Sequence, residues 1–128
     1  MTRRPTVLIV DDSKVMRTII RKMLGPDGPE VLEATDGRHA LQVLAVHAVD
    51  CIISDWNMPR MTGIDLLRRV RNDSALVNTP FVMVTAEALA ANLAEAATAQ
   101  VSSYLIKPFT AADLRRIIRE VLPGALAG

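Results

Sequence analysis

The sequence predicts an α/β fold in which a parallel β-sheet is covered by helices on both faces. Five short apolar runs alternate with five stretches in which apolar residues recur at helical spacing, the pattern of repeated strand–helix units. The chain of 128 residues shows neither a linker nor an internal repeat, so residues 1–128 are expected to form a single domain. Half of the residues are hydrophobic (50%) and the net charge is only +1, which indicates a packed core and not a disordered chain.

The first two strand–helix units occupy the first third of the chain. Residues 7–10, Val-Leu-Ile-Val, form a continuous apolar run, which is typical of a strand buried on both faces. Residues 13–24 have apolar side chains at helical spacing, and Gly25-Pro26 is expected to end that helix. Residues 30–34 are more polar and suit a strand at the sheet edge, and residues 37–46 follow as the second helix.

Three further strand–helix units follow. Residues 51–54 and 81–84 are short apolar runs, and Pro80 stands at the start of the second run, where a missing N–H is tolerated. Thr110 and Asp113 have the spacing of a variant capping box, which predicts a helix start. The remaining predicted elements are helices at 63–71, 87–99 (rich in alanine) and 110–122, and a strand at 104–106.

Composition excludes several classes of protein. No apolar run approaches the ~20 residues that a membrane-spanning helix needs, so no membrane partner is expected. Residues 1–5 lead directly into the first strand, which argues against a secretory signal peptide. The single cysteine, Cys51, has no internal disulfide partner and suits a reducing cytoplasm. The near-neutral, evenly spread charge argues against nucleic-acid binding.

Residues with complementary chemistry follow the predicted strands. Asp11 and Asp12 follow the first strand, Asp55 the third, Thr85 the fourth and Lys107 the fifth. Each alone has an ordinary explanation as a helix cap, a turn former or a solvated loop residue. In a parallel sheet, however, the carboxyl ends of all strands meet at one edge, so these side chains are expected together.

This combination predicts phosphoryl chemistry. Three adjacent carboxylates repel one another and need a cation, and oxygen ligands suit Mg²⁺ or Mn²⁺. A carboxylate can also act as a nucleophile and form an acyl phosphate. In-line phosphoryl transfer needs charge neutralisation above all, which a metal ion and a lysine supply together.

Four segments carry a resemblance to a known family. They resemble the receiver domain of two-component response regulators, most closely the chemotaxis regulators of the CheY type, over nearly the whole chain. The resemblance implies a flavodoxin-like (CheY-like) fold of five strands in the order 2-1-3-4-5 and a stand-alone receiver domain over 1–128, without an output domain. The segments are Val10-Asp11-Asp12-Ser13, Ile53-Ser54-Asp55-Trp56-Asn57-Met58-Pro59, Met83-Val84-Thr85-Ala86-Glu87-Ala88 and Tyr104-Leu105-Ile106-Lys107-Pro108-Phe109.

The resemblance implies a role for each polar residue of the predicted site. Asp55 would accept a phosphoryl group from a histidine kinase. Asp12 and Asp55 would ligate Mg²⁺ directly, together with the backbone carbonyl of Asn57, and Asp11 would hold the ion through water. Lys107 would pair with the phosphoryl oxygens, and its bond to the following proline would be cis.

The resemblance also implies a switch. Thr85 would move inward to hydrogen-bond the phosphoryl group, and Tyr104 would turn into the space that it leaves. Asn57 and Glu87 stand at positions that tune dephosphorylation, so a phosphatase is a further possible partner. The chain would then be a cytoplasmic signalling protein and not an enzyme, although it would support its own phosphorylation and autodephosphorylation.

The sequence departs from the family pattern on the expected output face. Leu89 and Ile117 stand where exposed lysines are typical, so an apolar face with Tyr104 is expected to bind the downstream target. Gln100 stands where glycine usually ends the fourth helix, in a conformation that would cost glutamine roughly 1 kcal/mol. Local rebuilding of that helix end is therefore expected.

Other functions remain open on the sequence alone. A phosphorelay intermediate or a phosphate sink would use the same chemistry with a different output. A hydrolase of the haloacid dehalogenase type also uses an aspartate nucleophile, but it would need a second acid where this chain has Asn57. A flavodoxin-like phosphate-binding protein is disfavoured, because Asp11 and Asp12 would repel phosphate unless a metal ion intervened.

Overall fold

The protein is built on one parallel sheet. In the computed structural model, which describes residues 4–87 and 89–126, the strand order is β2-β1-β3-β4-β5, as the sequence predicted. The more polar β2 lies at one edge, also as predicted, and β5 lies at the other. The strands are β1 (Thr6–Val10), β2 (Glu30–Ala34), β3 (Cys51–Asp55), β4 (Phe81–Thr85) and β5 (Ser103–Ile106).

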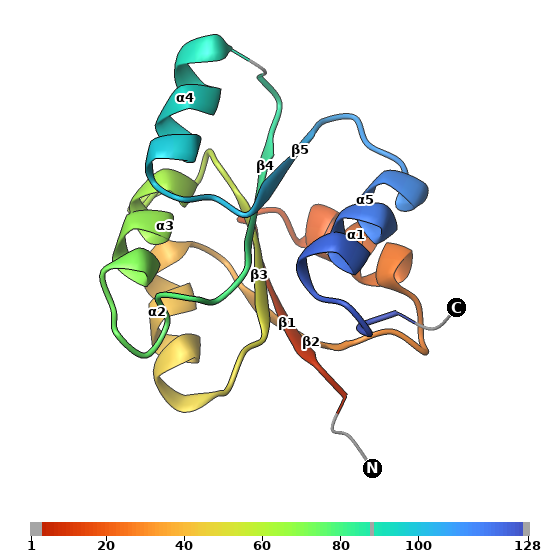
Figure 1. Cartoon of the computed structure of the whole chain (residues 1–128). Helices are drawn as coiled ribbons and strands as arrows, with labels where there is room; N and C mark the ends of the chain where they lie inside the picture. The colour runs from red at the N-terminus through yellow and green to blue at the C-terminus, as the bar shows by residue number, and fades with distance from the viewer. Residues whose placement is uncertain (1–3, 88, 127–128) are drawn as a thin grey trace.

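Helices cover both faces of this sheet. Figure 1 shows α1 and α5 on one face and α2, α3 and α4 on the other, so the predicted three-layer α/β fold is confirmed. None of the helices in the described part of the chain is both long and apolar enough to cross a membrane. The helices are α1 (Lys14–Leu24), α2 (Gly37–Val46), α3 (Gly63–Arg71), α4 (Ala90–Thr98) and α5 (Ala111–Val121).

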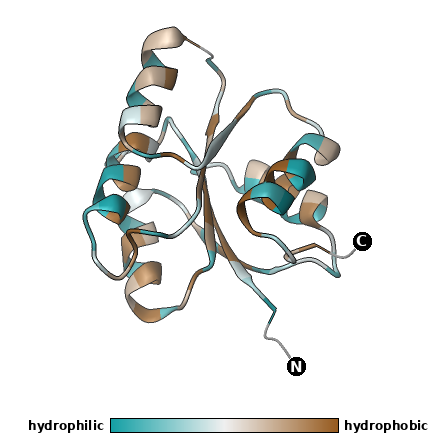
Figure 2. Ribbon diagram, viewed as in Figure 1, coloured by the Kyte–Doolittle hydropathy of each residue, from teal (hydrophilic) through white to brown (hydrophobic). Residues whose placement is uncertain are grey.

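The sheet separates two hydrophobic cores. Side chains alternate along each strand, so Val7 and Ile9 of β1 pack with α1 and α5, whereas Leu8 and Val10 pack on the opposite face. Figure 2 shows the hydrophobic strands lying between the helices of the two layers. The continuous apolar runs of β1, β3 and β4 thus reflect burial on both faces.

Side-chain caps set most helix starts. Ser13, Asp36 and Thr62 each accept a hydrogen bond from the backbone N–H three residues later. Thr110 and Asp113 form the predicted capping box at α5. Because a cap residue keeps an extended backbone, α1 and α5 begin one residue after the predicted positions.

Helix α4 is shorter than predicted. It begins at Ala90, with Leu89 as its N-cap, and Glu87, expected in its first turn, lies outside the helix, whereas Ala88 falls outside the described residues. The Thr85 hydroxyl accepts a hydrogen bond from the Glu87 N–H and donates one to the Glu87 carbonyl, both at 3.1 Å, which holds Glu87 in the loop. Leu89 provides no side-chain cap.

The end of α4 keeps the conformation that glycine usually supplies. Gln100 has a φ of 67°, in the left-handed region. The N–H groups of Gln100 and Val101 donate to the carbonyls of Ala97 and Ala96, which is the hydrogen-bond pattern of a Schellman motif. The expectation of a rebuilt helix end is therefore wrong, because Arg71 donates to the Gln100 carbonyl (2.9 Å) and these bonds hold the residue in place.

Candidate functional site

Polar side chains gather at the carboxyl ends of the strands. Asp11 follows β1, Asp55 ends β3, Thr85 ends β4 and Lys107 follows β5. Because all pairings in the sheet are parallel, these ends lie at the same edge. The structure thus brings together the residues that the sequence placed there.

Three carboxylates form the centre of the site. Asp11, Asp12 and Asp55 each offer an oxygen within 4.8 Å of the others. Asp11 and Asp55 are buried, with 2% and 8% of their surfaces exposed, whereas Asp12 is exposed. The cluster is therefore closed on the protein side and open toward solvent at Asp12.

The surroundings oppose negative charge on the two buried acids. Burial raises the pKa of Asp55, and the nearby Lys107 ammonium lowers it by charge and hydrogen bonding. Burial also raises the pKa of Asp11, with a further increase from the charge of Asp55, and the hydrogen bond from the Ser13 N–H (2.8 Å) acts in the opposite direction. A cation bound between these acids would relieve both effects.

This donor set fits a hard divalent cation. Its side-chain ligands are all carboxylate oxygens, and Asp12 is exposed to solvent. Mg²⁺ favours a few carboxylates together with water and phosphate oxygens, whereas zinc sites are usually built from histidine and cysteine. Asp11, Asp12 and Asp55 are thus the residues able to hold Mg²⁺ or Mn²⁺.

Lys107 completes the charged centre. Its Nζ lies 3.3 Å from Oδ1 of Asp55, and its backbone N–H donates to the Thr85 carbonyl at 2.8 Å. The Lys107–Pro108 peptide bond is cis, as the resemblance implied. The ammonium group thus lies beside the carboxylate of the candidate nucleophile.

The comparisons with known proteins place the chain in a family. The sequence model of the response regulator receiver domain matches residues 7–119. The chain belongs to the response regulator receiver family. Chemotaxis protein CheY of Pseudomonas aeruginosa is 48% identical over 116 residues, covering 90% of this chain and 94% of that protein. Chemotaxis protein CheY-3 of Vibrio cholerae is 42% identical over 122 residues, covering 94% of each.

Solved structures agree with this assignment. The structure of chemotaxis protein CheY4 of Vibrio cholerae superposes with a TM-score of 0.89 at 37% sequence identity, covering 94% of this chain and all (100%) of that one. The predicted CheY-like fold is therefore confirmed, and the chain is the receiver domain of a CheY-type response regulator.

The residues of the predicted switch occupy different environments in this receiver domain. Thr85 is buried (2% exposed), and its hydroxyl bonds the backbone of Glu87. Tyr104 is half-buried on the sheet face covered by α2, α3 and α4. Asn57 and Glu87 are exposed near the site. Their roles in switching and dephosphorylation stay predictions.

The prediction of an apolar output face is wrong for one of its residues. Leu89 is exposed (58%), as expected, but Ile117 is buried (4%) in the core shared by α1 and α5. Leu114, Ile117 and Ile118 form one stripe at helical spacing that faces the sheet. Ile117 thus packs on the opposite sheet face from Tyr104 and is not available to a partner.

Two residues of the receiver site were missed from the sequence. Arg17 on α1 donates to the Asp11 carbonyl at 2.7 Å. Gly63 begins α3 against the end of β3, where its N–H donates to the Trp56 carbonyl at 2.8 Å. A Cβ at Gly63 would collide with the Asp55 carbonyl oxygen. The sequence did contain a signal for Gly63, because a glycine stands at a predicted helix start eight residues after the candidate nucleophile. No local sequence feature indicated a role for Arg17.

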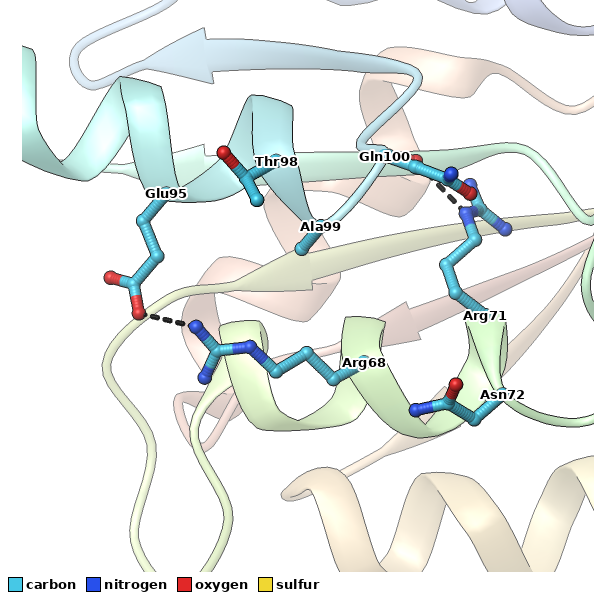
Figure 3. Close-up of a pocket in the computed structure, with 7 residues that line it drawn as sticks. All are labelled: Arg68, Arg71, Asn72, Glu95, Thr98, Ala99 and Gln100. Carbon is cyan, nitrogen blue, oxygen red and sulfur yellow. Dashed lines mark hydrogen bonds and ion pairs between the residues drawn. The ribbon is translucent and has the colours of Figure 1, made fainter.

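A separate hollow lies between α3 and α4, away from the acidic site. Figure 3 shows Arg68 pairing with Glu95 across it (2.6 Å) and Arg71 bonding the Gln100 carbonyl. Arg71 also donates to the carbonyls of Val77 and Thr79. The hollow, of about 460 Å³, is thus bounded by side chains that tie α3 to the C-terminal end of α4.

Proposed function

We propose that this receiver domain accepts a phosphoryl group on Asp55 from the phosphohistidine of a histidine kinase. The observation that carries the proposal is the pairing of a buried carboxylate with Lys107 inside a cluster of three acids. Such a cluster is an unfavourable arrangement of charge unless a bound cation neutralises it. The family assignment supports the same chemistry.

Each residue of the site has a role in the proposed transfer. An Asp55 carboxylate oxygen attacks phosphorus, and the bond between phosphorus and the kinase's histidine nitrogen breaks. Asp12, Asp55 and the Asn57 carbonyl would hold Mg²⁺ directly, with Asp11 acting through water. When bound there, Mg²⁺ supplies neutralisation of charge on the transferring group. Lys107 provides the second positive charge beside Asp55.

The transfer would be read out through Thr85 and Tyr104. A phosphoryl oxygen on Asp55 would offer the Thr85 hydroxyl a charged acceptor in place of the Glu87 carbonyl that it bonds now. Releasing Glu87 would alter the loop that leads into α4, and Tyr104 would follow into the vacated space. Asn57 and Glu87 would then influence the lifetime of the acyl phosphate, with or without a phosphatase.

The kinase domain is proposed to dock over α1. An apolar groove of about 380 Å³ lies there and ends at Lys107, so a protein seated in it would present its phosphohistidine toward Asp55. Val15, 70% exposed on α1, extends the same apolar surface. The groove is lined by Met16, Ile19, Met23, Lys107, Pro108 and Phe109.

The pathway is proposed to be of the chemotaxis type. The relatives at 48% and 42% identity are named as chemotaxis proteins, and they match nearly the whole chain. A phosphorelay intermediate or a phosphate sink remains the alternative output. Cys51 is unpaired and buried, in keeping with the reducing cytoplasm in which such a pathway would operate.

The test is labelling with acetyl phosphate and Mg²⁺, followed by intact-protein mass spectrometry. We expect wild type to gain one phosphoryl group and Asp55→Asn to gain none, because the amide lacks an anionic oxygen nucleophile. Asp65→Asn, at an exposed position on α3, is the matched control and should label like wild type. A stoichiometric adduct on Asp55→Asn would refute the proposal, and rapid turnover of acetyl phosphate by wild type without an accumulating adduct would indicate a hydrolase.

A further inference from the structure

Arg17 connects three parts of the fold beside the acidic cluster. Its side chain rises from α1 and is only 12% exposed. Nη1 donates to the Asp11 carbonyl at 2.7 Å, and Nε donates to Oε1 of Glu33 on β2 at 2.8 Å. One planar guanidinium therefore links the end of β1 to β2 and to α1.

The carbonyl that Arg17 binds belongs to the peptide between the first two acids. The Asp11 N–H donates to the Ala34 carbonyl of β2 at 3.1 Å, and the Asp11 carboxylate accepts from the Ser13 N–H. With Arg17 on the carbonyl, the backbone of Asp11 is fixed on both sides. The orientation of this peptide sets the direction in which Asp12 leaves the strand, and so the position of its carboxylate.

Arg17 acts on the cluster without pairing with its carboxylates in any contact that the structure records. Its charge is matched by Glu33, which also accepts from Arg21 at 2.6 Å. The two arginines lower the pKa of Glu33, so that partner stays ionised. The guanidinium is thus held by an anion outside the site and directed at a backbone oxygen inside it.

Arg21 offers a built-in comparison. It lies one helical turn after Arg17 and pairs with the same Glu33, but it makes no recorded contact with Asp11. A purely structural role, joining α1 to β2, would be shared by both arginines. A role in shaping the acidic cluster belongs to Arg17 alone.

We propose that Arg17 is a positioning residue for the metal site, and that it orients the Asp11–Asp12 peptide so that the two carboxylates face one cation. This inference rests on the proposed Mg²⁺ site. Residues that orient metal ligands through hydrogen bonds change metal affinity by about 10- to 100-fold when they are removed. Arg17→Gln should therefore weaken Mg²⁺ binding by about tenfold or more.

The experiment is a Mg²⁺ titration of the full chain, followed by the fluorescence of Trp56, which is half-buried next to Asp55. Mn²⁺ titration followed by electron paramagnetic resonance gives a second measure of binding that does not depend on tryptophan. Arg21→Gln is the matched control, and urea unfolding of both variants measures their stability. We expect Arg17→Gln to lose affinity and Arg21→Gln to bind like wild type, at similar unfolding midpoints.

Further variants keep the test decisive. Arg17→Lys supplies an ammonium that reaches one acceptor at a time and should restore affinity partly, even if Arg17→Gln folds poorly. Equal affinities of wild type and the Arg17 variants would overturn the inference and leave the metal site standing. An equal loss in Arg21→Gln would reduce Arg17 to a structural role. A wild type that binds neither ion would overturn the metal site itself, and this inference with it.

Discussion

Asp11 carries a charge that the folded protein opposes. Because burial raises its pKa, the folded state binds a proton more tightly than the unfolded chain does. The stability of the metal-free protein is therefore expected to fall as the pH rises through the ordinary carboxyl range and then through the raised pKa. Above the ordinary carboxyl range Asp11 is therefore a destabilising group, and a bound cation would compensate for this effect.

Asp11→Asn should accordingly stabilise the metal-free protein near neutral pH. The amide removes the charge, and its oxygen can still accept the Ser13 N–H. The gain should disappear as the pH falls below both the folded and unfolded pKa values, where wild type is protonated in both states. Urea unfolding with a chelator at the two pH extremes measures this, with the exposed Asp27→Asn as control. A gain of the same size at both extremes would contradict the assignment.

At the scale of single elements, α2 and α3 both begin with a glycine but in different surroundings. A Cβ at Gly63 would overlap the Asp55 carbonyl and come within 2.8 Å of the Met83 sulfur, so backbone would have to move. A Cβ at Gly37 would have three side-chain atoms of Met61 as its nearest neighbours, at 2.7–2.9 Å. Only the first of these contacts involves the strand that carries the candidate nucleophile.

Gly63→Ala should therefore destabilise the protein by about 1–3 kcal/mol, the usual cost of overpacking. Gly37→Ala should cost less, because its three closest contacts are all with the Met61 side chain: Cγ and Sδ can turn away, and relieving the 2.8 Å contact with Cβ takes a shift of the Met61 loop and not of a central strand. Urea unfolding compares the two variants directly, and acetyl phosphate labelling reports any displacement of Asp55. Equal destabilisation would show that the close approach of α3 to β3 is not the cause.

The C-terminal end of α4 depends on a side chain from α3. Arg71 donates to the backbone carbonyls of Gln100, Val77 and Thr79, which lie in loops outside the sheet. Arg71→Gln should cost roughly 1–3 kcal/mol, since these acceptors lose a charged donor. Arg69→Gln, at an exposed position on the same helix, should be nearly neutral. Thermal unfolding distinguishes them, and equal melting temperatures would contradict this role of Arg71.

At the scale of the whole molecule, Leu89 is an exposed apolar residue on the predicted output surface, immediately before α4. Leu89→Lys should leave acetyl phosphate labelling unchanged and weaken binding of the phosphorylated protein to its target by about tenfold, the usual effect of a central apolar contact. Val46→Lys is the matched control, because Val46 is 75% exposed on α2, on another part of the surface. Binding affinity is measured by titration against the target protein, and equal losses in both variants would refute a specific role for Leu89.

Much of the fold and the site could be predicted because their signals are local. Runs such as residues 7–10 are apolar at every position, and parallel strands bring their carboxyl ends together whatever the helices do. The start of α4 could not be predicted, because the Thr85 hydroxyl competes for the Glu87 backbone. Arg17 was missed because its partner Glu33 lies sixteen residues away and meets it only after folding.

Ile117 shows a different source of error. The spacing of Leu114, Ile117 and Ile118 already indicated a buried stripe, but the family pattern suggested an exposed position. The structure follows the periodicity of the helix. At Ile117 the family pattern and the helical periodicity of this chain disagreed. The periodicity predicted the burial of this residue correctly.

The shallow seating of α4 has an energetic consequence. Of residues 90–98, all described, Ala96 alone is buried, so undocking this helix uncovers little apolar surface. We therefore expect undocking of α4 to cost less free energy than opening either core, which is held by larger side chains. Reversing a 99:1 population takes about 5.5 kcal/mol of differential binding. A phosphoryl group or a partner that favours the undocked helix by that amount would redistribute α4 while the rest of the sheet stays intact.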